Sequence, residues 1–259
     1  MAETLSTVMG AKLAPQMDEI VARYCQANSG LMRGITALGS RLERLGGGMG
    51  AEGRKALEAV TRRSLRSAYR VTAASDTGRV DRPRRWRESD RLHASMALTT
   101  GAVGGFFGPG ASLAELPVSI TTILRAIRSV ARDYGYDPDD PETARDCLLV
   151  FTSGSPEPGD DGVDSAFLSA RLTLTGSSTD FLIRTVSKKL SVMLGTRLGA
   201  QAVPVLGALS GAAVNYSFVR FYIEMAHVFF ALRRLGEDSD PEDVIRDFRS
   251  AVARAEGRH

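Results

Sequence analysis

The chain has 259 residues, of which 43% are hydrophobic and 24% are charged, and its formal net charge is +3. This composition is that of a globular protein and excludes a disordered chain. Two cysteines, Cys25 and Cys147, are too few for a disulfide framework or a zinc cluster, and they favour a reducing compartment. The first twenty residues lack the basic cluster and apolar core of a secretory signal, so we expect a cytoplasmic protein.

The charged residues are distributed unevenly along the chain. Residues 33–91 hold 15 Lys and Arg against 7 Asp and Glu, whereas residues 133–164 hold 10 acids and one base, Arg145. The two regions are expected either to attract one another or to face different partners.

Nearly every periodic stretch has helical spacing, which predicts an all-α fold, a multi-helix bundle with long, glycine-rich central helices. In chain order, the first helices are predicted at 14–26, 31–45 and 52–74, followed by an exposed arginine-rich connection at 76–91. We expect residues 1–91 to form a basic helical region that packs on a core of residues 92–259, within one continuous globular unit.

The helix predicted at 52–74 carries an apolar stripe and a basic outer face. Basic residues on this face and in the connection after it are candidates for contact with an anionic lipid surface: Lys55, Arg62, Arg63, Arg66, Arg70, Arg84 and Arg85. The alternative is a solvated face that the acidic residues of 133–164 neutralise. Trp86 among arginines also raises nucleic-acid binding, which we do not favour because no recognised binding motif accompanies it.

Two stretches without any charge, 94–114 and 198–219, are each long enough to be considered as membrane spans. A Gly-Pro-Gly run in the first stretch and several polar residues in the second oppose insertion into a membrane. We therefore favour buried core helices over reversible insertion or a permanent span. Close packing of helix backbones is predicted by four GxxxG pairs: Gly101 with Gly105, Gly104 with Gly108, Gly195 with Gly199, and Gly207 with Gly211.

Pro117 marks the expected start of the next helix. Because proline removes a helical N–H, the helix is predicted to begin at Leu116 or Pro117 and to leave Glu115 in the turn at its entrance. There the helix dipole would stabilise the carboxylate, and Arg125 or an arginine of the C-terminal helix could reach it. The competing interpretation is a capping box of Ser112 with Glu115, which would make Glu115 purely structural.

Two later connections between predicted helices share the same pattern of helix-ending and helix-capping residues. A helix is predicted to end at Gly135 or at Gly236, and Asp140 or Asp240 is predicted to cap the helix that follows. The acids at the first joint lack the spacing of a calcium loop, and the three histidines are widely scattered. We therefore expect no metal site and no cofactor.

The long helix predicted at 204–236 has a broad apolar face that also includes Asn215 and Arg233, and an opposite face with Glu224, His227 and Arg234. We favour a solvated opposite face with Arg220 and Glu224 paired at i, i+4. The alternative is that Glu224 and His227 act as ligands or as an acid/base couple. A buried Asn215 needs hydrogen-bond partners, so it is either a tie between helices or part of a polar pocket.

Two segments of the chain resemble the hallmark segments of the EcsC protein family. The first, within 101–155, has E-L-P, L-R-x-I and D-P-E in the family's order, and the second, within 187–236, has A-x-x-N and A-H-x-F-x-x-x-R-R-L. The resemblance marks these positions as family-like: Glu115, Pro117, Thr121, Arg125, Asn215, His227, Arg233 and Arg234. The family takes its name from a protein encoded beside the subunits of a bacterial ABC transporter, and the resemblance implies no particular reaction.

Two functions follow as expectations. The leading one is a non-enzymatic accessory protein, cytoplasmic and peripheral to the inner membrane, that acts through anionic lipid or through a membrane-protein partner such as an ABC transporter. The alternative is a hydrolase-like enzyme in which Glu115 and His227 serve as acid and base, while Arg125, Asn215, Arg233 or Arg234 holds the ligand or anion. That mechanism requires Glu115 and His227 to converge in one cleft.

Overall fold

The computed structural model describes residues 2–28, 50–75, 109–153, 178–201 and 207–257. Within these helices the side chains of residues 2–14, 73–75, 109–115, 196–201 and 207–215 lie outside the description. The helix predicted at 31–45, the connection at 76–91 with Arg84 and Arg85, and most of the uncharged stretch 94–114 also lie outside the described residues.

All regular elements in the described ranges are helical, which confirms the predicted all-α fold. In chain order they are α1 (Ala2–Ala27), α3 (Ala51–Ser75), α5 (Pro109–Asp133), α6 (Pro141–Leu149), the short 3₁₀ helix η2 (Val150–Thr152), α8 (Thr179–Gln201), α9 (Gly207–Leu235) and α10 (Pro241–Glu256).

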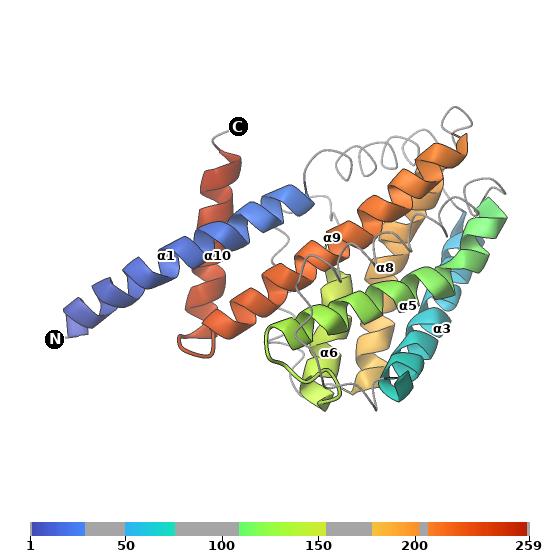
Figure 1. Ribbon diagram of the computed structural model, residues 1–259. Coiled ribbons are helices and arrows are strands. Elements are labelled where there is room, and N and C mark those ends of the chain that lie inside the picture. The colour runs from blue at the N-terminus through green and yellow to red at the C-terminus, as the bar shows by residue number, and fades with distance from the viewer. Residues whose placement is uncertain (1, 29–49, 76–108, 154–177, 202–206, 258–259) are drawn as a thin grey trace.

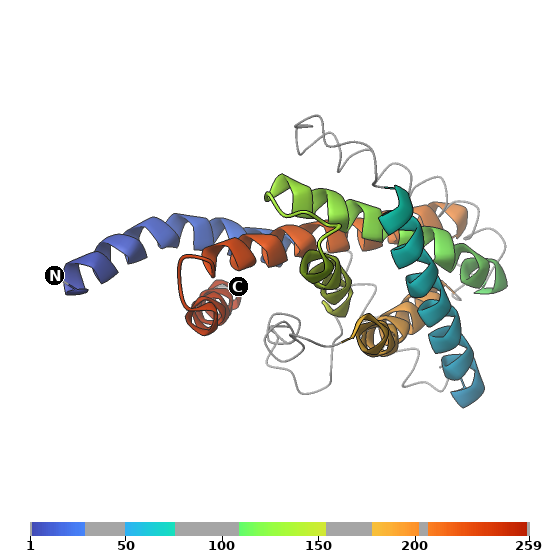
Figure 2. The same ribbon diagram turned by 90° about the horizontal axis from the view of Figure 1, so that it is seen from below.

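The long helix α9 crosses the middle of the molecule, and the other helices pack around it (Figure 1). On one side α1 packs against α9 and α10, and the N-terminal half of α1 projects beyond the body (Figures 1 and 2). On the other side α5 packs against α9, while α3 lies across both α5 and α8. The helices before and after residue 91 therefore share one packed body.

The core is continuous from α1 to α10, as the predicted apolar stripes require. Along α5, residues from Leu116 to Val130 at helical spacing are buried, and α9 is buried at every position from Phe221 to Phe230. A helix that is buried on all sides belongs at the centre of a bundle. No helix in the described parts of the chain is long and apolar enough to cross a membrane.

The predicted entrance of α5 is wrong. The helix begins at Pro109 and continues through Pro117, so Glu115 lies inside the helix instead of in a turn before it. Ser112 is likewise inside the helix, which rules out the predicted capping box at this point. Proline removes one backbone hydrogen bond, and the packing of α5 against α3 and α9 outweighs this local cost.

The joints between helices are as predicted. Gly135 follows α5 with φ +87°, a backbone conformation that favours glycine, and Asp140 accepts hydrogen bonds from the backbone N–H groups of Glu142 and Thr143. At the second joint α9 ends at Leu235, and Asp240 accepts from the N–H of Glu242. The first joint fixes where α6 begins after α5, and the second fixes where α10 begins after α9.

The predicted role of the glycine pairs can be examined at one glycine, Gly195, within the described side chains. A Cβ atom added at Gly195 would meet Leu57 of α3 at 3.7 Å, which is an ordinary van der Waals distance. No close backbone approach therefore requires glycine at this position. The other glycines of the four GxxxG pairs lie outside the described side chains.

Candidate functional site

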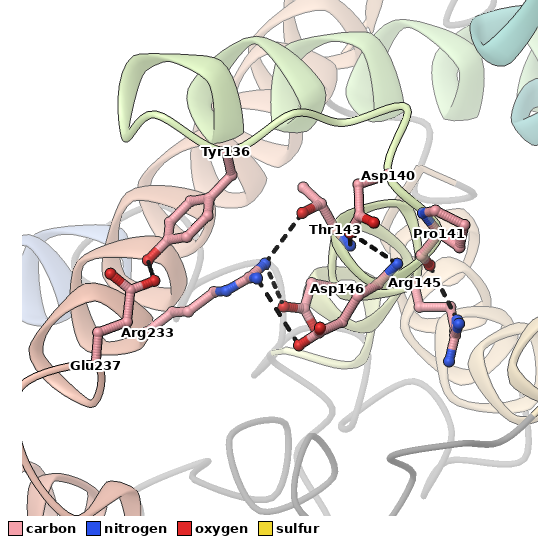
Figure 3. Close-up of polar contacts among 9 residues, drawn as sticks. Tyr136, Asp140, Pro141, Thr143, Arg145, Asp146, Arg233 and Glu237 are labelled. Carbon is pink, nitrogen blue, oxygen red and sulfur yellow. Dashed lines mark hydrogen bonds and ion pairs between the residues drawn. The ribbon is translucent and has the colours of Figure 1, made fainter.

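A buried ionic network joins the end of α9 to α6. Arg233 lies in the last turn of α9, and its Nη1 donates hydrogen bonds to Asp146 Oδ2 at 2.8 Å and to Thr143 Oγ1 at 3.3 Å (Figure 3). The Asp146 side chain is 4% exposed and that of Arg233 11%. Because burying a charge without a partner is costly, this pair must form whenever α6 docks on α9.

The connection between α5 and α6 folds over the same network. The Arg233 guanidinium carbon lies 4.0 Å from the ring centroid of Tyr136, and the hydroxyl of Tyr136 donates to Glu237 Oε1 at 2.7 Å (Figure 3). From α5, the buried Arg128 donates to the carbonyl oxygen of Pro138 at 2.8 Å and pairs with Asp139. The predicted acidic joint is thus tied down by arginines on two helices.

A second ionic group lies where α1 crosses α9. Glu224 accepts a hydrogen bond from Arg23 of α1 at 3.0 Å and another from Arg220 at 3.0 Å, so each carboxylate oxygen has a guanidinium partner. The predicted i, i+4 pair of Arg220 with Glu224 is confirmed. The predicted solvated face is wrong, because Glu224 is 8% and His227 1% exposed. Helix α1 covers this side of α9.

His227 packs beside Tyr134, the residue that follows α5, with ring centroids 5.9 Å apart. Burial raises the pKa of the Tyr134 phenol to about 12, and Arg23 opposes this rise. The phenol therefore stays protonated at neutral pH. The carbonyl oxygen of Tyr134 accepts a hydrogen bond from the exposed Arg234 at 3.4 Å. Tyr134 thus lies between α9 and the ionic group at α1.

The family-like polar residues do not form one centre. His227, Arg233 and Arg234 gather near Tyr134 at the C-terminal ends of α5 and α9. Glu115 lies 18 residues before the last residue of α5, Asp133, which is about 27 Å along the axis at 1.5 Å per residue. The structure therefore does not bring Glu115 together with His227.

The remaining anion-binding candidates also lie apart from Arg233. Arg125 is exposed on α5. Asn215 belongs to the N-terminal half of α9, 18 residues and about 27 Å before Arg233, and its side chain lies outside the description. Both helices run in the same direction, so Glu115 and Asn215 lie toward the same end of the molecule (Figure 1). Glu115 and Asn215 therefore lie toward one end of this helix pair and Arg233 and Arg234 at the other end, while Thr121 and Arg125 lie between the ends of α5.

Helix α3 has the predicted amphipathic character. Its inner face buries Leu57, Leu65 and Ala68 against α5 and α8. Its outer face carries the predicted basic residues, of which Lys55, Arg63 and Arg70 are exposed and Arg62 and Arg66 are half-buried. At 100° per residue these five positions fall within about 100° of arc, so they form one stripe. We call this stripe the α3 basic face.

The acidic segment does not neutralise the α3 basic face within the described residues. Arg66 pairs with Asp180 of α8 at 2.9 Å, whereas Asp139 of the acidic segment pairs with Arg128 and Asp146 pairs with Arg233. The α3 basic face and the acidic joint therefore belong to different parts of the surface.

No group of three or more His, Cys, Asp or Glu side chains is placed to hold a metal ion among the described residues. Cys147 is fully buried, and burial raises the pKa of its thiol to about 12, so it is not a thiolate at neutral pH.

The family model of the EcsC protein family matches residues 80–235, more than half of the chain. The protein belongs to the EcsC family. The match includes α5, α6, α8 and all of α9, and it therefore contains both arginine-centred ties to the α5–α6 connection. No curated protein and no solved structure matches this chain.

Proposed function

We propose that this protein is a non-enzymatic accessory protein that attaches reversibly to an anionic membrane surface through the α3 basic face. In this proposal it is cytoplasmic and works at the inner membrane. The observation that carries the proposal is the stripe of Lys55, Arg63 and Arg70, which is exposed on a helix whose opposite face is anchored in the core.

The magnitude of the attraction is sufficient for reversible attachment. A Lys or Arg near an anionic bilayer contributes about 1 kcal/mol, and the attraction falls off within a Debye length of the surface. Three to five such residues on one rigid helix would bind together, because the core already fixes their relative positions. Binding of this kind weakens as the salt concentration rises.

The buried ionic groups support a structural role for the family-like arginines. Arg233 is paired with Asp146, and Glu224 already has two guanidinium partners, so these groups hold helices together in the described structure. The enzymatic alternative built on Glu115 and His227 is not part of this proposal, because α5 holds Glu115 far from His227. A membrane-protein partner, such as the subunits of an ABC transporter, is the second element of the proposal.

Vesicle flotation tests the proposed function. The full chain is mixed with phosphatidylcholine vesicles that contain either no anionic lipid or about 30% phosphatidylglycerol, at low and at high salt. The proposal predicts co-flotation with the anionic vesicles at low salt and weaker co-flotation at high salt. Absence of binding to the anionic vesicles at both salt concentrations would contradict it.

A further inference from the structure

Helix α8 presents an outward stripe that combines apolar and basic side chains. Phe181 is 49% exposed and Val192 54%, and both are among the large apolar residues that the described surface leaves uncovered. Lys188 lies between them on the same side of the helix, seven residues after Phe181 and four before Val192, and it is exposed. Arg184 is exposed at the edge of this stripe.

The α8 stripe continues the α3 basic face. Arg66 Nη2 of that face lies 2.9 Å from Asp180 Oδ1, and Asp180 directly precedes Phe181. Asp180 is the single acid between Thr179 and Gly195, and this ion pair neutralises it. The stripe is consequently basic and apolar, and it begins where the α3 basic face meets α8.

We propose that Phe181 and Val192 insert into the interfacial region of an anionic bilayer while Lys188 and the α3 basic face contact the headgroups. This inference rests on the proposed function and extends it, since it adds α8 to the membrane surface and adds an apolar contribution that salt does not screen. An anionic bilayer fits the surface because aromatic and aliphatic side chains partition into the interface beside basic residues.

The α8 stripe differs from a purely polar, solvated helix face because its apolar side chains gain free energy on leaving water. A half-exposed Phe or Val in water gains free energy when its remaining apolar area leaves water, at about 25 cal/mol for each Å². The basic residues bring the stripe to the surface and the apolar residues then slow its release. Attachment should therefore retain a salt-resistant component, in contrast to binding by the α3 basic face alone.

Paired substitutions in the full chain test this inference with the same anionic vesicles. Phe181→Ser/Val192→Ser should bind about fivefold more weakly and lose the salt-resistant component. The matched control is Val118→Ser, because Val118 is 52% exposed and lies on α5 instead of α8. This control should bind like the unsubstituted protein. Circular dichroism verifies that each variant remains helical.

A direct measurement of insertion complements the binding data. Trp86 is the one tryptophan of the chain, so Phe181→Trp and Val118→Trp are each made in a Trp86→Phe background. Anionic vesicles whose lipid chains carry bromine should quench the tryptophan introduced at position 181 and should leave the one at position 118 unquenched. Quenching at 181 together with the fivefold loss supports the inference.

The remaining outcomes overturn the inference in distinguishable ways. If the α8 double variant binds like the unsubstituted protein and position 181 is not quenched, the inference fails while the proposed function stands. Weaker binding without quenching also overturns it, because the side chain at position 181 then does not enter the bilayer. If the unsubstituted protein binds no anionic vesicle, the proposed function itself fails, and the inference fails with it.

Discussion

At the scale of single residues, Arg233 shows how this chain tolerates a charge in its interior. The guanidinium has a carboxylate partner in Asp146, a hydroxyl partner in Thr143 and an aromatic ring from Tyr136 over its face. Three elements of the chain thus meet at one side chain. The sequence placed Arg233 on the inward face of its helix, but its partners could not be predicted because they depend on how α6 docks.

Asp146 should be essential for stability. Asp146→Ala leaves the Arg233 charge buried without its carboxylate partner, and we expect a loss of about 3–5 kcal/mol in the free energy of unfolding. Urea unfolding at neutral pH measures this change. The matched control is Asp243→Ala, which breaks the exposed pair with Arg246 and should cost at most about 1 kcal/mol. Equal losses of unfolding free energy in both variants would show that the buried pair contributes no more to stability than the exposed pair.

Tyr134 should make the folded state sensitive to alkali. Its pKa is raised to about 12 because burial disfavours the phenolate, so the folded protein holds the phenol proton more tightly than the unfolded chain does. This contribution is complete below pH 10 and is lost as the pH rises from about 10 to about 12. We therefore measure urea unfolding at pH 9 and at pH 11.5. Between these two pH values, the free energy of unfolding should fall less for Tyr134→Phe than for the unsubstituted protein. An identical loss in both proteins would contradict the assignment.

At the scale of helices, some boundaries depend on local sequence, whereas other boundaries and the burial of helix faces depend on tertiary packing. Helix caps follow from local chemistry, and both Asp-Pro joints were predictable for that reason. The start of α5 was not, because tertiary packing carries the helix through Pro117. The burial of Glu224 and His227 was also not predictable, because it depends on α1, which comes from the other end of the chain.

The cap at Asp140 should depend on its negative charge. Hydrogen bonds from the backbone N–H groups of Thr143 and Glu142 lower the pKa of its carboxyl group. The stabilisation by the Asp140 carboxylate is complete above about pH 4, which is the ordinary pKa of an aspartate side chain. It is lost as the pH falls through the lowered pKa of the folded state. Asp140→Ala should cost about 1 kcal/mol at pH 7 in thermal unfolding. Asp140→Asn, which keeps an acceptor, should cost less and should remove this part of the acid sensitivity.

Gly195 should tolerate a side chain. Because an added Cβ would lie 3.7 Å from Leu57, Gly195→Ala fits between α8 and α3 and should raise stability by about 0.5–1 kcal/mol, since alanine favours the helix. Gly135→Ala is the contrasting variant. Its φ of +87° is unfavourable for alanine, and we expect a loss of about 1 kcal/mol. Destabilisation by Gly195→Ala in chemical unfolding would mean that the two backbones do need to approach closely there.

At the scale of the whole molecule, the described charges fall into separate regions. The α3 basic face lies on one side, and α10 lies on the other side of α9 (Figure 1). Composition and periodicity predicted the basic helix and the all-α fold, because both depend on the spacing of residues within one segment. Periodicity could not predict that Glu115 lies far from His227, because that distance depends on the relative direction and register of two distant helices.

The most direct test of membrane attachment by the α3 basic face compares two charge reversals of equal size. Arg63→Glu/Arg70→Glu alters exposed residues on α3, and Arg249→Glu/Arg254→Glu alters exposed residues on α10, so the net charge changes equally. In titrations with anionic vesicles at low salt, the α3 pair should weaken binding by at least about tenfold, while the α10 pair should leave it nearly unchanged. Equal weakening by both pairs, or none by the α3 pair, would contradict attachment through the α3 basic face.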